Sequence, residues 1–406
     1  MGCIHVGLVA LLALGPMGRV QDDPGKDKPR TIRDEFEEIA KKHGATTPDE
    51  RYRALVDDYN AGREGYERAL REAKTDEERR EVRSKKYVGP ESYTHLFQRL
   101  ARLHPKDPAA LDALAWIGSH DPAGPEGYEA MTILPRDHIG SDKLGPVCDA
   151  VAYLPTAPAE SFLRAIGEKS PHRDVRARAR FALALILKRW SDNAADLAQP
   201  ETARAQQMAR YFGEPISERI RKDPRAITEE AEQLFESIVQ NDGGVAFKGG
   251  RLGDAAASAL HEMRDLAVGK PAPEIVAMDL DGQAMKLSDF RGRVVVVNFW
   301  ATWCGPCMAL VPHERALVKR LEGKPFVLVG VSGDEDADKA RQAVRREDMT
   351  WRSWWDGGRD GPTATRWNVH AWPAIYVLDR QGIIRYKWNE SPGPEPLGKA
   401  IDDLLR

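Results

Sequence analysis

The 406-residue sequence has little cysteine, little excess charge and no long apolar run. Four cysteines cannot stabilise a disulfide-rich scaffold of this length. The 60 Lys and Arg balance 63 Asp and Glu to a formal charge of −3, so we expect no basic surface for nucleic acid or anionic membranes. Hydrophobic residues make up 42% and charged residues 30%, which indicates a folded protein of two or three domains.

The apolar run at residues 6–14 is too short for a transmembrane segment, which takes about 20 residues. It fits the core of a secretory signal, so residues 1–20 are expected to be a signal peptide and the protein to be exported, periplasmic or otherwise extracytoplasmic. The run has no Lys or Arg before it, however, and the protein is cytoplasmic if the run is not a signal.

Residues 21–30 are charged and rich in Pro and Gly, which indicates a flexible leader. Residues 31–265 are expected to form an all-α region. Thr47 and Thr75 each precede a Glu by three positions, the spacing of a helix capping box, and Asp107 and Asp223 stand directly before prolines. The helices could stack as a repeat-like array or form an irregular bundle, because the sequence shows no fixed period.

The pattern changes near residue 266. Short β-type runs at 275–278, 294–300, 326–331, 374–379 and 383–387 alternate with helical patterns at 308–321, 336–346 and 396–405. This alternation predicts an α/β sheet over residues 266–406. Eight of the ten tryptophans lie in this part of the chain, which sets it apart in composition as well.

Cys304-Gly305-Pro306-Cys307 follows the predicted strand at 294–300 and opens a predicted helix. The free backbone N–H groups and positive dipole of a helix start stabilise an anion, so the Cys304 thiolate should form readily. Cys307 lies one turn further along the same face and can attack a mixed disulfide formed at Cys304. A zinc site would need a second ligand pair that the sequence lacks, and a structural disulfide closing so short a loop would add little stability.

Residues 296–307 (VVNFWATWCGPC) resemble the thioredoxin-like TlpA, ResA and redoxin proteins, as do residues 269–273 (GKPAP), 287–293 (LSDFRGR) and 372–379 (WPAIYVLD). The resemblance covers about residues 266–406. It implies a thioredoxin fold in which Pro373 is cis and lies opposite the dithiol. Trp372 stands before that proline, where it either narrows the substrate groove or packs into the core.

Two departures from the family pattern concern the proton of Cys307. The resemblance implies a buried Asp in the central strand or a Glu three residues after the second cysteine, and this chain has Asn298 and Leu310 there. Deprotonation of Cys307 is therefore left to solvent or to a group not yet identified. His313 and Glu314, further along the helix, are expected at the surface.

The resemblance and the dithiol together predict a thiol-disulfide oxidoreductase that reduces disulfides in exported proteins. Its catalytic residues are Cys304 and Cys307, and its substrate groove is expected to contain Trp303, Gly305, Pro306, Trp372 and Pro373. The Gly-Pro pair between the cysteines is of the type found in reducing thioredoxins. We expect protein disulfides and an upstream thiol donor as partners, with no metal, organic cofactor or nucleic acid.

Two other functions stay open on the sequence. One is a redoxin-type thiol peroxidase, and the other is a helical scaffold that carries an accessory thioredoxin module. Cys148 lies in the helical region and is expected to be a small buried residue rather than a partner for Cys304. His120, His138 and His172 have no metal-ligand spacing and are expected to be structural.

Overall fold

The computed structural model describes residues 31–406, so the expected signal peptide and leader lie outside the described residues. Two compact units divide the chain between Val88 and Gly89. The described part of the first unit is a set of three helices: α1 (Ile32–Lys42), α2 (Pro48–Glu72) and α3 (Asp76–Lys85). The hydroxyls of Thr47 and Thr75 cap α2 and α3 in the capping boxes that the sequence predicts.

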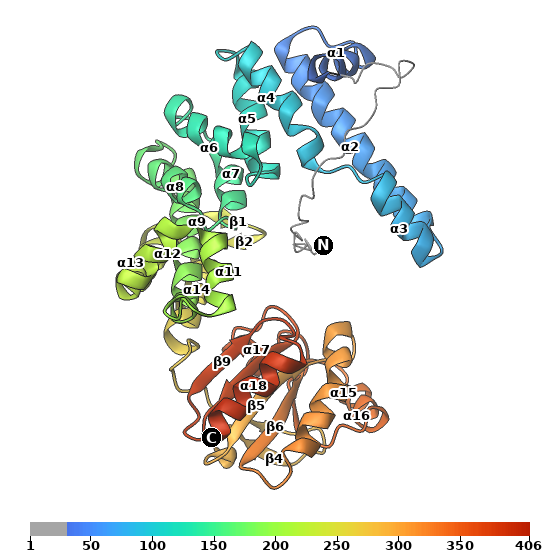
Figure 1. Cartoon of the computed structure of the whole chain (residues 1–406), viewed down its shortest axis with the longest axis vertical. Coiled ribbons are helices and arrows are strands. Elements are labelled where there is room, and N and C mark those ends of the chain that lie inside the picture. The colour runs from blue at the N-terminus through green and yellow to red at the C-terminus, as the bar shows by residue number, and fades with distance from the viewer. Residues whose placement is uncertain (1–30) are drawn as a thin grey trace. The chain divides into compact units, whose positions relative to one another are not determined.

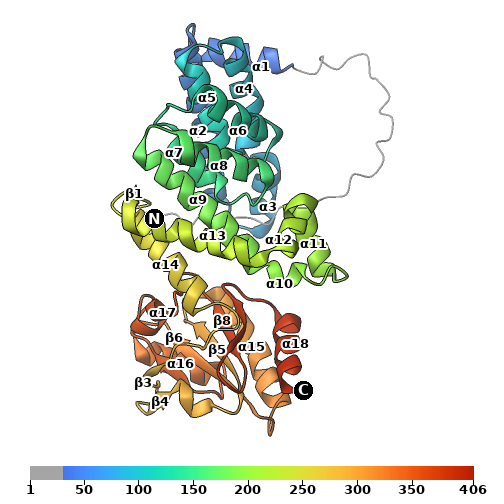
Figure 2. The same ribbon diagram turned by 90° about the vertical axis from the view of Figure 1, so that its left-hand side faces the viewer.

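The second unit begins with a helical region (Figure 2). Asp107 and Asp223 cap the helices that begin at Pro108 and Pro224, as expected, and a short hairpin with two residues in each strand interrupts the helices near residue 248. The elements are α4 (Thr94–Leu103), α5 (Pro108–His120), α6 (Pro125–Asp137), α7 (Leu144–Val151), α8 (Ala157–Lys169), α9 (Arg173–Asp192), α10 (Ala194–Leu197), α11 (Ala203–Phe212), α12 (Glu214–Lys222), α13 (Pro224–Ser237), β1 (Ala246–Phe247), β2 (Gly250–Arg251) and α14 (Leu252–Asp265).

The rest of the second unit is an α/β domain of thioredoxin-like fold, so the predicted fold class is confirmed (Figure 1). A short hairpin precedes the central sheet. The elements are β3 (Val276–Met278), β4 (Ala284–Lys286), β5 (Val294–Trp300), α15 (Gly305–Arg320), β6 (Phe326–Ser332), α16 (Ala337–Arg346), β7 (Ser353–Trp355), α17 (Pro362–Arg366), β8 (Ala374–Leu378), β9 (Ile384–Trp388) and α18 (Pro394–Leu405).

The central sheet has the strand order β7-β6-β5-β8-β9. Strands β5, β6 and β7 run parallel, and β8 and β9 are antiparallel to their neighbours. Every residue of β5 is buried, as expected for a central strand covered on both faces. The run of valines that predicts this strand in the sequence therefore also explains its place in the middle of the sheet.

Alternate residues of β5 face opposite sides of the sheet. Val296 and Trp300 pack in one apolar cluster with α15, α16 and α18, and this cluster includes both cysteines of the Cys-Gly-Pro-Cys segment. Val297 and Phe299 pack in a second cluster with α17 and the β3–β4 hairpin. Asn298 stands between Val296 and Trp300 in this alternation, so it belongs to the face that α15 covers.

Helix α14 joins the helical region to the α/β domain through polar contacts. Glu262 Oε1 lies 3.1 Å from Lys387 Nζ on β9 and 3.3 Å from Lys188 Nζ on α9. Ser258 donates a hydrogen bond of 2.7 Å to the side-chain oxygen of Asn368. These contacts attach α14 to α9, to β9 and to the segment that leads from α17 toward β8.

No helix among residues 31–406 combines the length and the apolar character that a membrane span requires.

Candidate active site

The dithiol segment lies where β5 ends and α15 begins. Cys304 is the N-cap residue of α15, and its sulfur is bonded to that of Cys307 with the two Cα atoms 5.2 Å apart. The backbone N–H of Cys307 points at Sγ of Cys304 over 3.1 Å. This N–H is one of the donors that the first turn of a helix leaves unpaired, and it would stabilise a thiolate on Cys304 after reduction.

The two cysteines differ in their access to solvent. Cys304 is 5% exposed to solvent and Cys307 only 1%, while Gly305 and Pro306 between them are exposed. Trp303, immediately before the pair, is 49% exposed. An approaching disulfide would therefore meet Trp303 and the Gly305-Pro306 turn, with Cys304 as the nearer of the two sulfurs.

The peptide bond between Trp372 and Pro373 is cis, as the resemblance implies. Trp372 is partly buried and belongs to the margin of both apolar clusters. Its ring stands edge-on to that of Trp303, with the ring centres 5.4 Å apart. Trp372 therefore packs partly into the core, and its ring also contacts that of the exposed Trp303.

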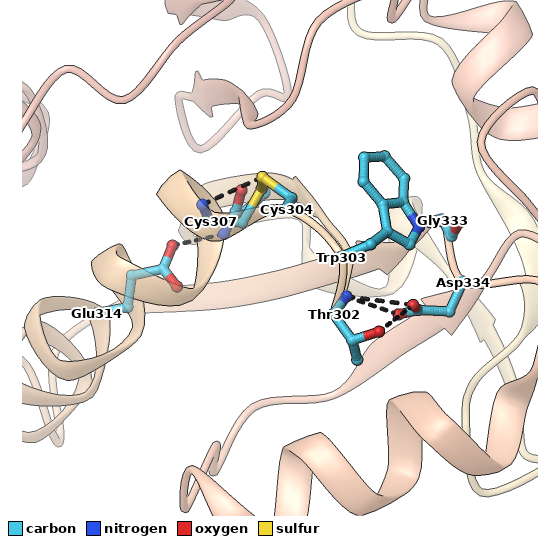
Figure 3. The surroundings of a disulfide bond; sticks show 8 residues. Thr302, Trp303, Cys304, Cys307, Glu314, Gly333 and Asp334 are labelled. Atoms are coloured by element: carbon cyan, nitrogen blue, oxygen red, sulfur yellow. Dashed lines mark hydrogen bonds between the residues drawn. A yellow bond between two sulfur atoms is a disulfide. The ribbon is translucent and has the colours of Figure 1, made fainter. Parts of the chain in front are cut away.

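Gly333, which follows β6, is part of this aromatic arrangement. A Cβ atom at this position would lie 2.3 Å from the Trp372 ring. Its carbonyl oxygen accepts a hydrogen bond of 3.4 Å from the indole N–H of Trp303 (Figure 3). No signal in the sequence points to this glycine, since only the fold brings it next to the two tryptophans.

Asp334 holds the loop before the dithiol. Its carboxylate accepts hydrogen bonds from the Thr302 hydroxyl at 2.6 Å and from the Thr302 backbone N–H at 3.1 Å (Figure 3). A surface hollow of about 450 Å³ opens beside this contact, lined by Trp303, Lys339 and Arg359 among others. The guanidinium of Arg359 lies over the Trp303 ring, 5.5 Å from its centre. The hollow therefore offers an aromatic side chain and charged groups, and its Trp303 directly precedes Cys304 in the chain.

The expectation that Glu314 is a surface residue is wrong. Its side chain is fully buried on α15, and Oε1 accepts a hydrogen bond of 2.7 Å from the amide of Asn298. Burial raises the pKa of the Glu314 carboxyl to about 8, against the opposing effect of the Asn298 hydrogen bond. His313 is only partly exposed, and its Nε2 is closed to solvent, so the surface prediction fails in part for it too.

Helical spacing was the signal that could have placed Glu314. It follows Cys307 by seven positions and Leu310 by four, and residues so spaced lie on one face of a helix. Since Cys307 and Leu310 are both buried, that face is the one toward the sheet. A charged residue is rarely buried without a partner, which is why its type alone pointed to the surface.

Cys148 lies on α7 and is completely buried, away from any disulfide. Burial, with a smaller effect from Asp149, raises the pKa of its thiol far above the ordinary value, so it is a poor nucleophile. The expectation of a small buried residue is confirmed. The Nε2–H of His172 donates a hydrogen bond of 2.9 Å to the carbonyl oxygen of Gly140, in keeping with a structural role.

Comparison with known proteins identifies the α/β domain. A family model described as Redoxin matches residues 267–403. The thiol-disulfide oxidoreductase ResA of Bacillus thuringiensis is 30% identical over 119 residues, which are 29% of this chain and 68% of that protein. The chain belongs to the redoxin family, and it is a thiol-disulfide oxidoreductase.

Other similar proteins match about a third of the chain. The thioredoxin-like protein YneN of Bacillus subtilis is 34% identical over 119 residues, 29% of this chain and 68% of that protein. A solved structure described as a putative thiol:disulfide interchange protein DsbE from Chlorobium tepidum is 28% identical. It covers 34% of this chain and 98% of its own, with a TM-score of 0.32.

Proposed function

We propose that this redoxin-family protein reduces disulfides in exported proteins, with Cys304 as the attacking residue and Cys307 as the resolving one. The observation that supports this order is the helix-start geometry, in which an N–H group is already directed at Sγ of Cys304. A thiolate at that atom gains this hydrogen bond and the favourable end of the α15 dipole. Cys307, inside the first turn and more deeply buried, has the position of a group that reacts second.

The reaction exchanges two electrons between the pair and a client. The Cys304 thiolate attacks one client sulfur, a new S–S bond forms, and the other client sulfur leaves as a thiolate. Cys307 then loses its proton and attacks Sγ of Cys304, so that the bond between Cys304 and the client breaks and the second client thiolate leaves. The client ends as a dithiol and the enzyme as the Cys304–Cys307 disulfide, which an upstream thiol donor must reduce again.

We infer that Trp303, Gly305, Pro306, Trp372 and Pro373 form the groove that receives the client. Trp303 and the Gly305-Pro306 turn are the exposed members, whereas Pro373 is buried and Trp372 supports Trp303 from behind. A half-exposed tryptophan beside a hollow offers apolar area to an extended peptide at little cost in side-chain entropy. A surface of this kind suits the binding of a protein disulfide, whereas a small oxidant would not need it.

The proposed place of action is outside the cytoplasm. Its support is the apolar run at residues 6–14, together with the reducing chemistry that exported disulfide proteins need. We further propose that residues 31–265 recruit clients or partners. Within the second unit, the contacts of α14 with β9 and with Asn368 attach this helix to the segment before Pro373.

Reduction of insulin disulfides by the reduced full chain tests the proposal. Wild type should turn over with a thiol donor, Cys304→Ser should be inactive, and Cys307→Ser should accumulate a mixed disulfide with the client. Cys148→Ser is the matched control and should retain wild-type activity, because its sulfur is buried and unpaired. Activity that survives Cys304→Ser would contradict the proposal, as would consumption of hydrogen peroxide much faster than reduction of insulin.

A further inference from the structure

A carboxyl and an amide face each other in the core of the α/β domain, on the sheet face that holds the dithiol. Glu314 on α15 and Asn298 on β5 are buried, with exposures of 0% and 1%. Figure 3 shows the Glu314 side chain directed back along its helix toward Cys307. Helical side chains lean toward the N-terminal end of their helix, which here is the end that carries the cysteines.

Each member of the pair has one oxygen that the rest of the described chain does not satisfy. Glu314 Oε2 and Asn298 Oδ1 are both closed to solvent and have no hydrogen-bond partner among the described residues. An ionised carboxylate has only acceptors to offer, so ionisation would leave both oxygens in deficit. A protonated carboxyl adds an O–H donor to a site that has a surplus of acceptors. The disulfide form of the protein thus favours the protonated state of Glu314.

The surroundings of Glu314 contain few other groups that could hold this proton. Strand β5 carries no ionisable side chain. The ionisable residues near Glu314 on its own helix and at the helix start are Cys304, Cys307, His313 and Arg315. Helix α18, which packs against α15, carries Glu395, Lys399, Asp402 and Asp403. Tyr386 of β9 packs at the edge of the same cluster, while Asp402 is engaged at the surface by Arg320 over 2.9 Å. Burial and the Asn298 hydrogen bond are the effects that act on Glu314 itself.

We propose that Glu314, oriented by Asn298, accepts the proton of Cys307 when that thiol attacks the mixed disulfide on Cys304. This inference rests on the proposed function, since it concerns the second step of that reaction. The S–H bond of Cys307 breaks and an O–H bond forms on Glu314, directly or across one bridging water, the range over which general bases act. The Cys304–Cys307 bond forms as the bond between Cys304 and the client breaks, and the client sulfur leaves as a thiolate. Reduction of the pair by the upstream thiol returns the proton from Glu314 to Cys307.

Burial also makes Glu314 a stronger base than an ordinary carboxylate. It raises the pKa of Glu314 to about 8, which brings the proton affinity of this carboxylate closer to that of a thiolate. A solvent-exposed glutamate, with its far lower pKa, would be a weaker base for this thiol. Its buried position, which the sequence did not predict, therefore makes Glu314 suitable to accept the proton of Cys307.

The test follows the mixed disulfide with glutathione disulfide as the probe. Reduced full-length protein is mixed with the probe and quenched with acid at successive times, and mass spectrometry measures the Cys304–glutathione adduct and its decay. Glu314→Gln keeps the shape and the oxygen that accepts from Asn298. We expect adduct formation at the wild-type rate and decay about ten- to a hundred-fold slower at pH 7. Glu314→Asp should recover part of the loss.

His313→Gln is the matched control on the same helix and should leave both rates unchanged. Decay of the adduct at the wild-type rate in Glu314→Gln between pH 6 and pH 9 would overturn the inference. Failure of the proposed function looks different, because then no adduct would form at Cys304 in any variant. If Glu314→Gln does not fold, the infrared difference between oxidised and reduced wild type decides instead. A buried carboxylic-acid carbonyl band that is lost on reduction supports the inference, and its absence overturns it.

Discussion

The amide nitrogen of Asn298 lies 2.7 Å from the carboxylate of Glu314, and neither side chain reaches solvent. The pair links the central strand to the helix that begins at the reactive cysteine. A buried carboxyl next to an amide is stable only if its charge is suppressed or shared. The acid–base behaviour of this domain should therefore depend on Glu314 more than on the exposed carboxylates around it.

The stability of the oxidised protein should fall as the pH rises from about 4.5 to about 8. The pKa of Glu314 is raised from 4.5 to about 8 by burial, so the native state binds a proton that the unfolded chain has already released in this window. Within this window the free energy of unfolding should fall by roughly 1.4 kcal/mol per pH unit because of Glu314, and this fall should be absent in Glu314→Gln. Urea unfolding of the two proteins at pH 5, 6.5 and 8 measures the difference; parallel pH dependences would contradict the prediction.

Gly333→Ala should destabilise the domain by about 1–3 kcal/mol, because the new methyl group overlaps the Trp372 ring and forces it to move. The displacement should also change the environment of Trp303 and lower the activity toward insulin. Thermal unfolding and tryptophan fluorescence of the oxidised protein report both effects.

Gly398→Ala is the control for that substitution. It lies on α18, where an added Cβ would meet only the Arg320 guanidinium at 3.9 Å. Its stability should equal or exceed that of wild type, since alanine is the better helix former. Equal stabilities of Gly333→Ala and Gly398→Ala would show that Trp372 is not held against Gly333.

Glu262→Gln should weaken the attachment of α14. The substitution leaves Lys188, which is 9% exposed, with Asp192 as its remaining ion-pair partner in the described chain, and leaves Lys387 without its carboxylate. We expect a loss of roughly 1–3 kcal/mol, as for a polar group left unsatisfied in a poorly solvated site.

The matched surface substitution is Glu236→Gln, which removes one exposed carboxylate from Arg264. Exposed ion pairs contribute little, so its effect should stay within about 1 kcal/mol. Urea unfolding of both variants at one pH gives the comparison. A loss in Glu262→Gln no larger than that in Glu236→Gln would mean that the Lys188–Glu262–Lys387 contact adds nothing to the attachment of α14.

Local signals in the sequence predicted much of the fold. The valines at 294–297 place β5 at the residues where it occurs, and the Thr-x-x-Glu spacing places the starts of α2 and α3. Strand β7 was missed because three residues with two adjacent tryptophans show no alternation. The division after Val88 was not predicted because helices lie on both sides of it.

The part of the site that lies in one segment of the chain could be predicted from the sequence. The part that the fold brings together from separate elements could not. Cys304 and Cys307 stand together in the sequence, and the strand before them predicts the helix start. Gly333 and Asp334 meet the dithiol loop only because β6 pairs beside β5. Helical spacing could have placed Glu314 on the buried face of α15, but its charge favoured the surface. Its buried partner Asn298 is 16 residues away on another element.

The reduction potential of the Cys304–Cys307 pair is the measurement that tests the central claim most directly. Tryptophan fluorescence against glutathione buffers can report it, because Trp300 and Trp303 lie next to the pair in the chain. A protein that reduces client disulfides should have a potential near −270 mV, about that of thioredoxin. A potential near −120 mV, about that of the oxidant DsbA, or the absence of any transition would contradict the account.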